Sequence, residues 1–213
     1  MKLSMLRYIF LMIYGLLKLI LCPLDWAWNK IFSVPLNVKD KMFFTGVVGG
    51  SGKSTAAETV SKRYGHKLVQ LDQAKFGPGW VRNTSDVYIG KVDAELKASI
   101  DGKYVIDGTY YDQKLPEQTN HNEFLMETAD IVAWNHIPKW VAYWRKLFRS
   151  FKRYLGLENG AHKESFNNVY NNQLNTWNRY SKRYKILNDK WEESSDASGK
   201  WVKYNWPFFY KVK

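Results

Sequence analysis

The sequence predicts an α/β fold in which helices flank a parallel sheet, with a hydrophobic helix at the N-terminus. Three observations lead to this prediction. Short apolar segments alternate with segments of helical spacing, an order typical of parallel sheets. The first apolar segment of this series leads directly into a glycine-rich loop. Two later segments stop at an aspartate, and open α/β sheets bind ligands at the carboxyl ends of their strands.

The predicted strands are short apolar runs bounded by turn residues or by the start of a helical pattern. In chain order they are residues 42–48, 67–71, 103–106, 129–134 and 200–206. The predicted helices are segments with helical spacing or, late in the chain, long polar character. They are residues 54–60, 86–100, 139–155 and about 164–193.

Length, charge and cysteine content set the outer limits. The 213 residues suit one α/β domain plus an appendage, which we expect to be residues 41–213 and 1–40. A formal net charge of +12 favours anionic partners, whether nucleotides, nucleic acid or acidic lipid, without choosing among them. The single cysteine, Cys22, excludes an internal disulfide framework and is consistent with a reducing, cytoplasmic compartment.

Residues 8–22 are almost wholly apolar, and three alternatives remain open for them. A membrane-spanning helix needs about 20 apolar residues, more than this run supplies. A cleaved signal peptide needs a small residue at its cleavage site, which is absent here. A helix lying in a membrane surface, or docked on the domain, fits the narrow polar stripe of Arg7, Tyr14, Lys18 and Asp25. Membrane association would then run through residues 3–28.

Residues 47–55 read Val-Val-Gly-Gly-Ser-Gly-Lys-Ser-Thr, a loop of the kind that binds nucleotide phosphates (a P-loop). Glycines let consecutive backbone N–H groups converge on phosphate oxygens, and the following helix directs its positive end at the anion. The usual pattern places its first glycine at Val47, whereas this chain has Gly46, so we expect a slightly altered turn. The predicted nucleotide contacts are Val48, Gly49, Gly50, Ser51, Gly52, Lys53, Ser54 and Thr55.

Each polar group of this loop has an expected role with ATP and Mg²⁺. Lys53, expected to be an exposed loop residue, supplies a charge for the β- and γ-phosphates, and Ser54 supplies a hydroxyl for Mg²⁺. Because the loop lysine is expected to be exposed, its replacement by alanine should change the fold little. The four histidines lack ligand spacing, so only the Mg²⁺ site is expected.

Two aspartates at strand ends are candidates for the chemistry. Asp107 is placed to hold the water shell of Mg²⁺ or to orient the acceptor, and the alternative is a carboxylate that caps the next turn. Asp72 is a candidate base or acceptor ligand. Arg82 and Trp80 could bind an acceptor phosphate and stack on a base, although an aromatic residue after Pro-Gly is as often a packing residue.

A basic helical face is predicted within residues 139–155, which contain no acidic residue. Arg145, Arg149 and Arg153 recur every four residues, so they share one face. Such a face suits a lid that closes over the donor phosphates and supplies an arginine. A solvated or lipid-facing basic surface is the alternative. A second pair, Arg179 and Arg183, is expected on a solvated face.

From about residue 41 onward, the order of these pieces resembles the adenylate-kinase-related P-loop kinases known as DNA topology modulation proteins. The resemblance rests on residues 50–55, Leu71-Asp72, Pro-Gly-Trp-Val at 78–81, Val-Ile-Asp-Gly-Thr-Tyr at 105–110, a strand ending at Trp134, and Trp144-Arg145 with Arg149 and Arg153. This chain departs from the family at Val47, at Thr109, where asparagine is usual, and in a longer stretch at 113–126. The resemblance implies a nucleoside-monophosphate-kinase-like P-loop fold.

The sequence therefore predicts a kinase that transfers the γ-phosphoryl group of ATP, with Mg²⁺, to a small acceptor, most plausibly a nucleotide or nucleoside. Lys53, Asp107, Asp72, Arg145 and Arg149 are the expected catalytic residues. The alternative is a non-catalytic ATP-binding module that associates with a membrane or with nucleic acid.

Overall fold

The computed structural model describes residues 33–47, 49, 51–77, 81–109, 116–155, 166–194, 199–205 and 209–212. The predicted hydrophobic helix, and with it residues 3–28, lies outside these ranges. Within them, no helix combines the length and the apolar composition needed to cross a membrane.

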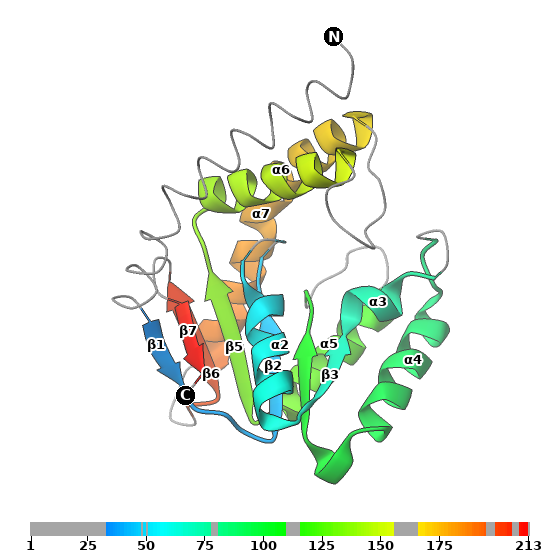
Figure 1. Cartoon of the computed structure of the whole chain (residues 1–213), viewed down its shortest axis with the longest axis vertical. Helices are drawn as coiled ribbons and strands as arrows, with labels where there is room; N and C mark the ends of the chain where they lie inside the picture. The colour runs from blue at the N-terminus through cyan, green and yellow to red at the C-terminus, as the bar shows by residue number, and fades with distance from the viewer. Residues whose placement is uncertain are drawn as a thin grey trace.

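Five parallel strands form the central sheet, in the spatial order β3-β4-β2-β5-β6 (Figure 1). Their bounds are β2 (Lys41–Thr45), β3 (Lys67–Gln70), β4 (Tyr104–Asp107), β5 (Ile131–His136) and β6 (Trp201–Asn205). The predicted parallel α/β sheet is confirmed. β2 ends earlier than predicted, at Thr45, and lies between β4 and β5 in the middle of the sheet.

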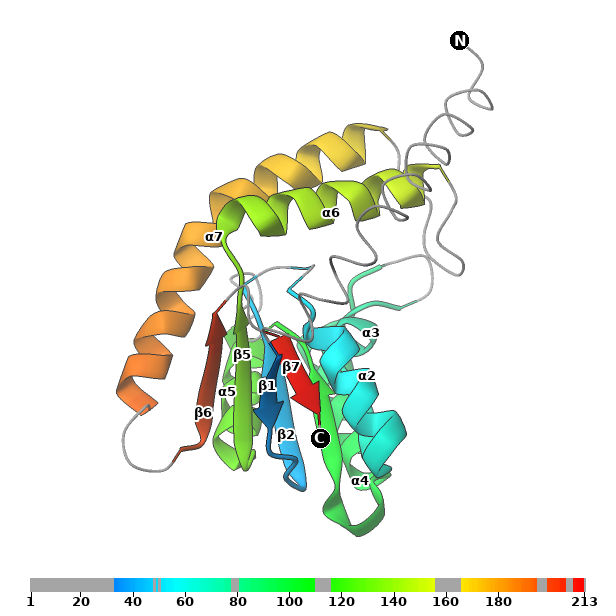
Figure 2. The ribbon, with the colours of Figure 1, turned by 60° about the vertical axis from the view of Figure 1, so that its left-hand side comes forward.

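Helices connect these strands, as parallel neighbours require. They are α2 (Lys53–Tyr64), α3 (Leu71–Lys75), α4 (Ser85–Lys97), α5 (Pro116–Thr128), α6 (Lys139–Tyr154) and α7 (Phe166–Ser194), with a short 3₁₀ turn at Ile100–Gly102. α6 and the first part of α7 lie above the carboxyl ends of the strands, and α7 then descends beside β6 (Figure 2). α5 is a helix that the sequence did not predict.

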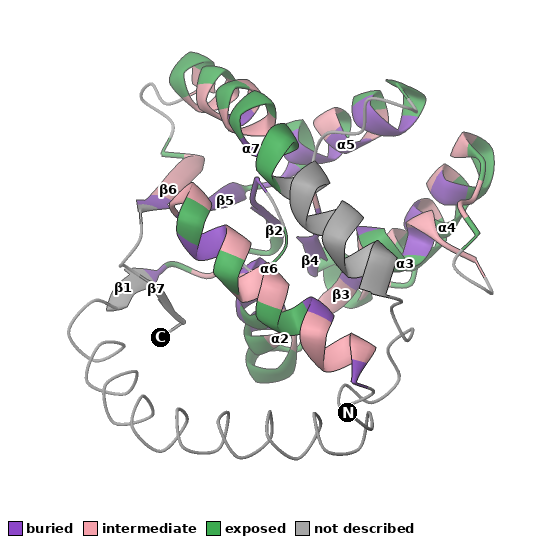
Figure 3. Ribbon diagram, turned by 90° about the horizontal axis from the view of Figure 1, so that it is seen from above, coloured by how far each residue is buried: buried purple, intermediate pink, exposed green. Residues whose placement is uncertain are grey.

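The sheet is buried on both faces, which explains why its strands read as continuous apolar runs. Phe43 of β2 packs in a cluster with residues of α4, α5 and α7, whereas its neighbours Met42 and Phe44 pack with α2 on the opposite face. All three side chains are fully buried, each worth about 1.5–3 kcal/mol of transfer free energy. Seen from above, α2 lies on one side of the strands and α4, α5 and α7 on the other (Figure 3).

A second, two-stranded parallel sheet joins β1 (Ser33–Leu36) to β7 (Phe209–Val212). The sequence predicted a link through this first segment and did not predict either strand. Leu36 is 2% exposed and belongs to the cluster on the α2 face. Leu36 therefore packs with the fold and β1 pairs with β7, although the boundary expected at residue 40 assigns both to the N-terminal segment.

Tyr180 connects α7 to the turn after β5, because its hydroxyl donates a hydrogen bond to the Ile137 carbonyl. Burial, and secondarily the neighbouring Tyr184, raises the pKa of Tyr180 to about 12 from its ordinary 10.0. The folded state thus holds this proton more tightly than the unfolded chain does. The resulting stability is fully present below about pH 10 and is lost as the pH rises towards 12.

We therefore expect Tyr180→Phe to lower the free energy of unfolding by about 1 kcal/mol at pH 7, where only the hydrogen bond is lost. The deficit should shrink or reverse by about pH 11.5, because only the wild type then has a phenol to ionise. Urea unfolding at both pH values measures this. An equal deficit at pH 7 and pH 11.5 would contradict the assignment.

Candidate nucleotide-binding site

The predicted P-loop lies at the carboxyl end of β2, where the connections of the sheet diverge. The crossover that leaves β2 leads to β3, beyond β4, whereas the connection that leaves β5 leads to β6 on the other side. Divergence between adjacent strands marks the usual ligand-binding position of an open α/β sheet. Figure 1 shows this end of the sheet facing α6.

A buried ion pair lies at the base of the loop. The Lys53 Nζ donates a hydrogen bond to Asp107 Oδ1 at 2.9 Å, and each residue is 6% exposed. Register explains the meeting: Asp107 is the last residue of β4 and pairs with Phe44 of β2, beside the strand that enters the loop. The expectation of an exposed Lys53 is wrong, because Lys53 is the first residue of α2 and is buried against the end of β4.

The N-terminus of α2 has the features of an anion site. Gly52 precedes the helix with φ of 87°, in the left-handed region that glycine adopts without strain. The first turn contains no acidic residue, so the helix dipole and free N–H groups are not neutralised there. Ser54 is half-buried and Thr55 is exposed, whereas Val48 and Gly50 lie outside the described residues.

Two residues that the sequence did not indicate as site residues donate side-chain hydrogen bonds to backbone carbonyls of the loop. The Asn135 side-chain amide, 3% exposed at the end of β5, donates a hydrogen bond to the Ser51 carbonyl. The Arg183 Nη1 donates to the Val47 carbonyl at 3.5 Å. Arg183 is half-buried, so its predicted place on a solvated face is wrong. An asparagine inside an otherwise apolar strand is the one sequence signal that could have indicated Asn135.

The displaced glycine of the motif has a steric role. A Cβ on Gly46 would lie 2.6 Å from the Ser51 Oγ, so only glycine lets the chain pass this close to the loop. Ser51 is 1% exposed, and its hydroxyl has no hydrogen-bond partner among the described residues. Val47, which occupies the usual glycine position, is buried in the core. The shift of the glycine by one residue thus agrees with an altered turn.

For the remaining predicted site residues, the structure gives their element and exposure. Asp72 is an exposed residue in the first turn of α3. It follows by two residues Gln70, the last residue of β3, which lies opposite Asp107 of β4 in the sheet. Arg82 is half-buried and forms an antiparallel bridge with Phe76, whereas Trp80 lies outside the described residues. Arg145 is half-buried and Arg149 exposed on α6, above the carboxyl ends of the strands.

The donor set suits Mg²⁺ held jointly with phosphates. Mg²⁺ usually binds proteins through one or two carboxylates and keeps substrate oxygens and water as its other ligands. Within the described ranges, no three His, Cys, Asp or Glu residues cluster to hold a metal ion by themselves. The Asp107 carboxylate and the Ser54 hydroxyl, close in the fold to the buried Lys53, provide the oxygen ligands that such a shared site needs.

Gly108 fixes the position of Asp107. A Cβ at Gly108 would lie 2.6 Å from the Leu71 Cβ, an atom too close to the backbone to move aside cheaply. We expect Gly108→Ala to lower the free energy of unfolding by about 1–3 kcal/mol. Gly90→Ala is the matched control: Gly90 is exposed within α4 and its Cβ would meet nothing within 4 Å, so the change should stabilise by about 0.5–1 kcal/mol. Equal urea midpoints for the two variants would contradict the steric argument.

No protein-family model matches this chain, and no curated protein matches its sequence. Among solved structures, the chain is similar to a gluconokinase from Sinorhizobium meliloti, with a TM-score of 0.40 and 15% identity over 78% of this chain and 81% of that chain. It is also similar to an unliganded sugar kinase from Janibacter, with a TM-score of 0.40 and 15% identity over 78% of this chain and 86% of that one. At such values, function has to be argued from the site itself.

Proposed function

We propose that this protein is a kinase that transfers the γ-phosphoryl group of ATP to a small acceptor. The observation that carries the proposal is the buried Lys53–Asp107 pair at the start of α2, beneath a glycine-rich loop at the diverging strands. Burying a lysine and a carboxylate together has a large desolvation cost, and buried charged groups of this kind cluster at functional sites. Phosphoryl transfer asks a protein chiefly for positioned cations and helix dipoles of this kind.

The Lys53–Asp107 ion pair implies that Lys53 changes its partner when ATP binds. Lys53 would give up its contact with Asp107 and donate to the β- and γ-phosphates, whose negative charge replaces that of the carboxylate. Asp107 and Ser54 would then hold Mg²⁺, which when bound neutralises phosphate charge and aligns the phosphates. The backbone N–H groups at the start of α2 would bind the same phosphates, and Asn135 would keep the loop in place.

For the acceptor, we retain the class expected from the sequence, a nucleotide or nucleoside. Asp72, exposed in the first turn of α3, would orient or deprotonate the acceptor hydroxyl, and Arg82 together with Trp80 would bind its other groups. The resemblance to adenylate-kinase-related P-loop kinases supports this choice. Arg145 and Arg149 would approach the donor phosphates from α6. Use of ATP is consistent with a cytoplasmic location, with residues 3–28 as a proposed membrane contact.

The test is ADP production by the purified full chain with Mg-ATP and a panel of nucleosides, nucleotides and sugars. The proposal expects release of ADP that depends on one acceptor class and falls strongly in Asp72→Asn. If ATP binding is detected by thermal shift but no member of the panel gives ADP, the kinase proposal fails. The non-catalytic ATP-binding module would then be the better description.

A further inference from the structure

An apolar patch lies on the outer side of α6 and α7. Its members are Trp140, Trp144 and Phe148 of α6 and Trp177 of α7, which are 55%, 52%, 44% and 44% exposed. Ring contacts of Tyr143 with Trp144 and Trp177, and of Trp144 with Phe148, join the two helices into one surface, the aromatic patch. Every exposed tryptophan among the described residues belongs to it. Contiguous exposed apolar patches of this kind commonly mark interaction sites.

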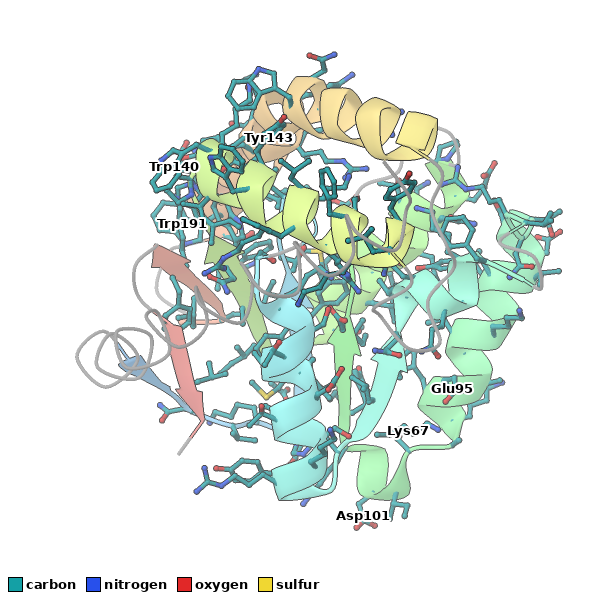
Figure 4. The ribbon with its side chains drawn as sticks, turned by 45° about the horizontal axis from the view of Figure 1, so that its top comes forward. Lys67, Glu95, Asp101, Trp140, Tyr143 and Trp191 are labelled. Atoms are coloured by element: carbon teal, nitrogen blue, oxygen red, sulfur yellow. The ribbon has the colours of Figure 1, made fainter. Side chains whose placement is uncertain are left out.

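An ordinary surface helix turns its apolar face to the core and its charged face to solvent, whereas α6 has the reverse arrangement. Ala142 is fully buried, so its face turns towards the body of the protein. Basic residues follow it on that face at helical spacing, namely Arg145, Lys146, Arg149 and Arg153. Trp140, Trp144 and Phe148 recur every four residues on the other side, directed away from the sheet. Figure 4 shows Trp140 at one end of α6 and Tyr143 between α6 and α7.

Charge decides among the occupants that could cover the aromatic patch. No acidic residue occurs between Lys139 and Leu155, and the Lys139 ammonium lies 3.9 Å from the centre of the Trp177 ring. The apolar N-terminal segment, residues 1–32, is itself basic, with Lys2, Arg7, Lys18 and Lys30 against Asp25. A second copy would bring the same basic helix. Neither complements the charge of α6, whereas an anionic lipid surface does.

The residue types support the same occupant. Tryptophan has a large apolar ring with one polar N–H and concentrates at the level of lipid headgroups. Helices that lie in a membrane surface combine Trp, Phe and Leu on one face with Lys and Arg on the other. α6 has this division along its whole length, and α7 extends it by one tryptophan.

We propose that the aromatic patch of α6 and α7 binds the surface of an anionic lipid bilayer. Trp140, Trp144, Phe148 and Trp177 enter the interfacial layer. The Lys139 ammonium, which lies over the Trp177 ring, meets the lipid phosphates, and the positive charge of α6 as a whole draws the helix to the anionic surface. The contact uses residues distinct from the N-terminal segment and does not depend on ATP turnover. It places the carboxyl ends of the strands, and the loop at Lys53, beneath a helix that lies against the membrane.

A fluorophore attached within the aromatic patch tests this contact separately from any other contact with the membrane. In full-length protein with Cys22→Ser, a polarity-sensitive fluorophore is attached at Phe148→Cys or, as the control, at Ile100→Cys. Ile100 is 78% exposed in the 3₁₀ turn, whose residue Asp101 lies at the far end of the molecule in Figure 4. Both proteins are mixed with vesicles of phosphatidylserine and phosphatidylcholine, with and without a quencher in the acyl chains.

The proposal expects the emission at position 148 to shift to the blue and to be quenched from the lipid, while position 100 stays unchanged. It also expects a much weaker response with phosphatidylcholine alone, since charge attracts the helix. The proposal is overturned if the protein binds vesicles without a change at position 148, or if it does not bind. Shielding at position 148 that rises with protein concentration in the absence of lipid overturns it as well, and indicates a second copy instead.

Discussion

Lys53→Met should lower ATP turnover by about 10³-fold, measured as ADP release with the acceptor that the panel identifies. The ammonium group is the one buried cation at the start of α2, where the phosphates would bind. Removing one preorganised charge stabiliser from an active site typically costs 10²–10³ in rate. Methionine keeps most of the length and the apolar stem of lysine, so the loss reports on charge rather than on packing.

Lys62→Met is the control for this variant. Lys62 lies on the same helix, but its side chain is 79% exposed and pairs with Glu58 one turn away. Its replacement should leave turnover within about twofold, because an exposed pair contributes little. If Lys53→Met retains more than about a tenth of the wild-type rate while Lys62→Met is unchanged, Lys53 does not act on the transferred phosphoryl group.

The same pair should dominate the stability of the site. Lys53→Met leaves Asp107 buried without its counter-charge, and breaking a buried ion pair in this way costs about 3–5 kcal/mol. We expect Lys53→Met with Asp107→Asn to recover much of that loss, because the second change removes the stranded charge. Urea unfolding of the wild type, both single variants and the double variant completes the cycle.

A surface pair provides the comparison. Lys67 Nζ lies 2.6 Å from Glu95, but the two side chains are 37% and 51% exposed, and Figure 4 shows both at the outer rim. Lys67→Met should therefore cost less than about 1 kcal/mol. Equal losses for Lys53→Met and Lys67→Met, or no recovery in the double variant, would mean that burial does not set the strength of the Lys53–Asp107 contact.

Local sequence patterns were sufficient to predict most of the sheet and to select Lys53 and Asp107, the two members of the buried ion pair, as site residues. A glycine-rich loop needs only adjacent residues to be recognised, and Asp107 follows a strand that is apolar on both faces. The burial of Lys53 depends on the register of β4 against β2, which the sequence of either strand does not contain. The sequence alone therefore predicts an exposed lysine.

The elements that the sequence did not predict lack local signals. The first two turns of α5 bury the polar residues Gln118, Thr119 and Asn122, and apolar residues are buried only later in the helix, at Leu125 and Met126. The Tyr88 hydroxyl donates a hydrogen bond to Asn122 Oδ1 at 2.6 Å. The inner face of α5 therefore shows little apolar periodicity. The support of the loop by Asn135 and Arg183 joins residues that are 84 and 136 positions from their acceptors. Contacts of this range follow from tertiary packing and not from spacing along the chain.

The pairing of β1 with β7 has a consequence for how the protein is made. β1 emerges from the ribosome before the rest of the sheet, whereas its partner is translated after α7 and β6. β7 also contacts α2 and β6, so the α2 face of the central sheet is covered at this edge only once β7 is in place. Until then, Leu36 and its neighbours have no partner strand, and a nascent chain is open to chaperones or to aggregation at this edge. The pairing of β1 with β7 can therefore form only after β7 has been translated.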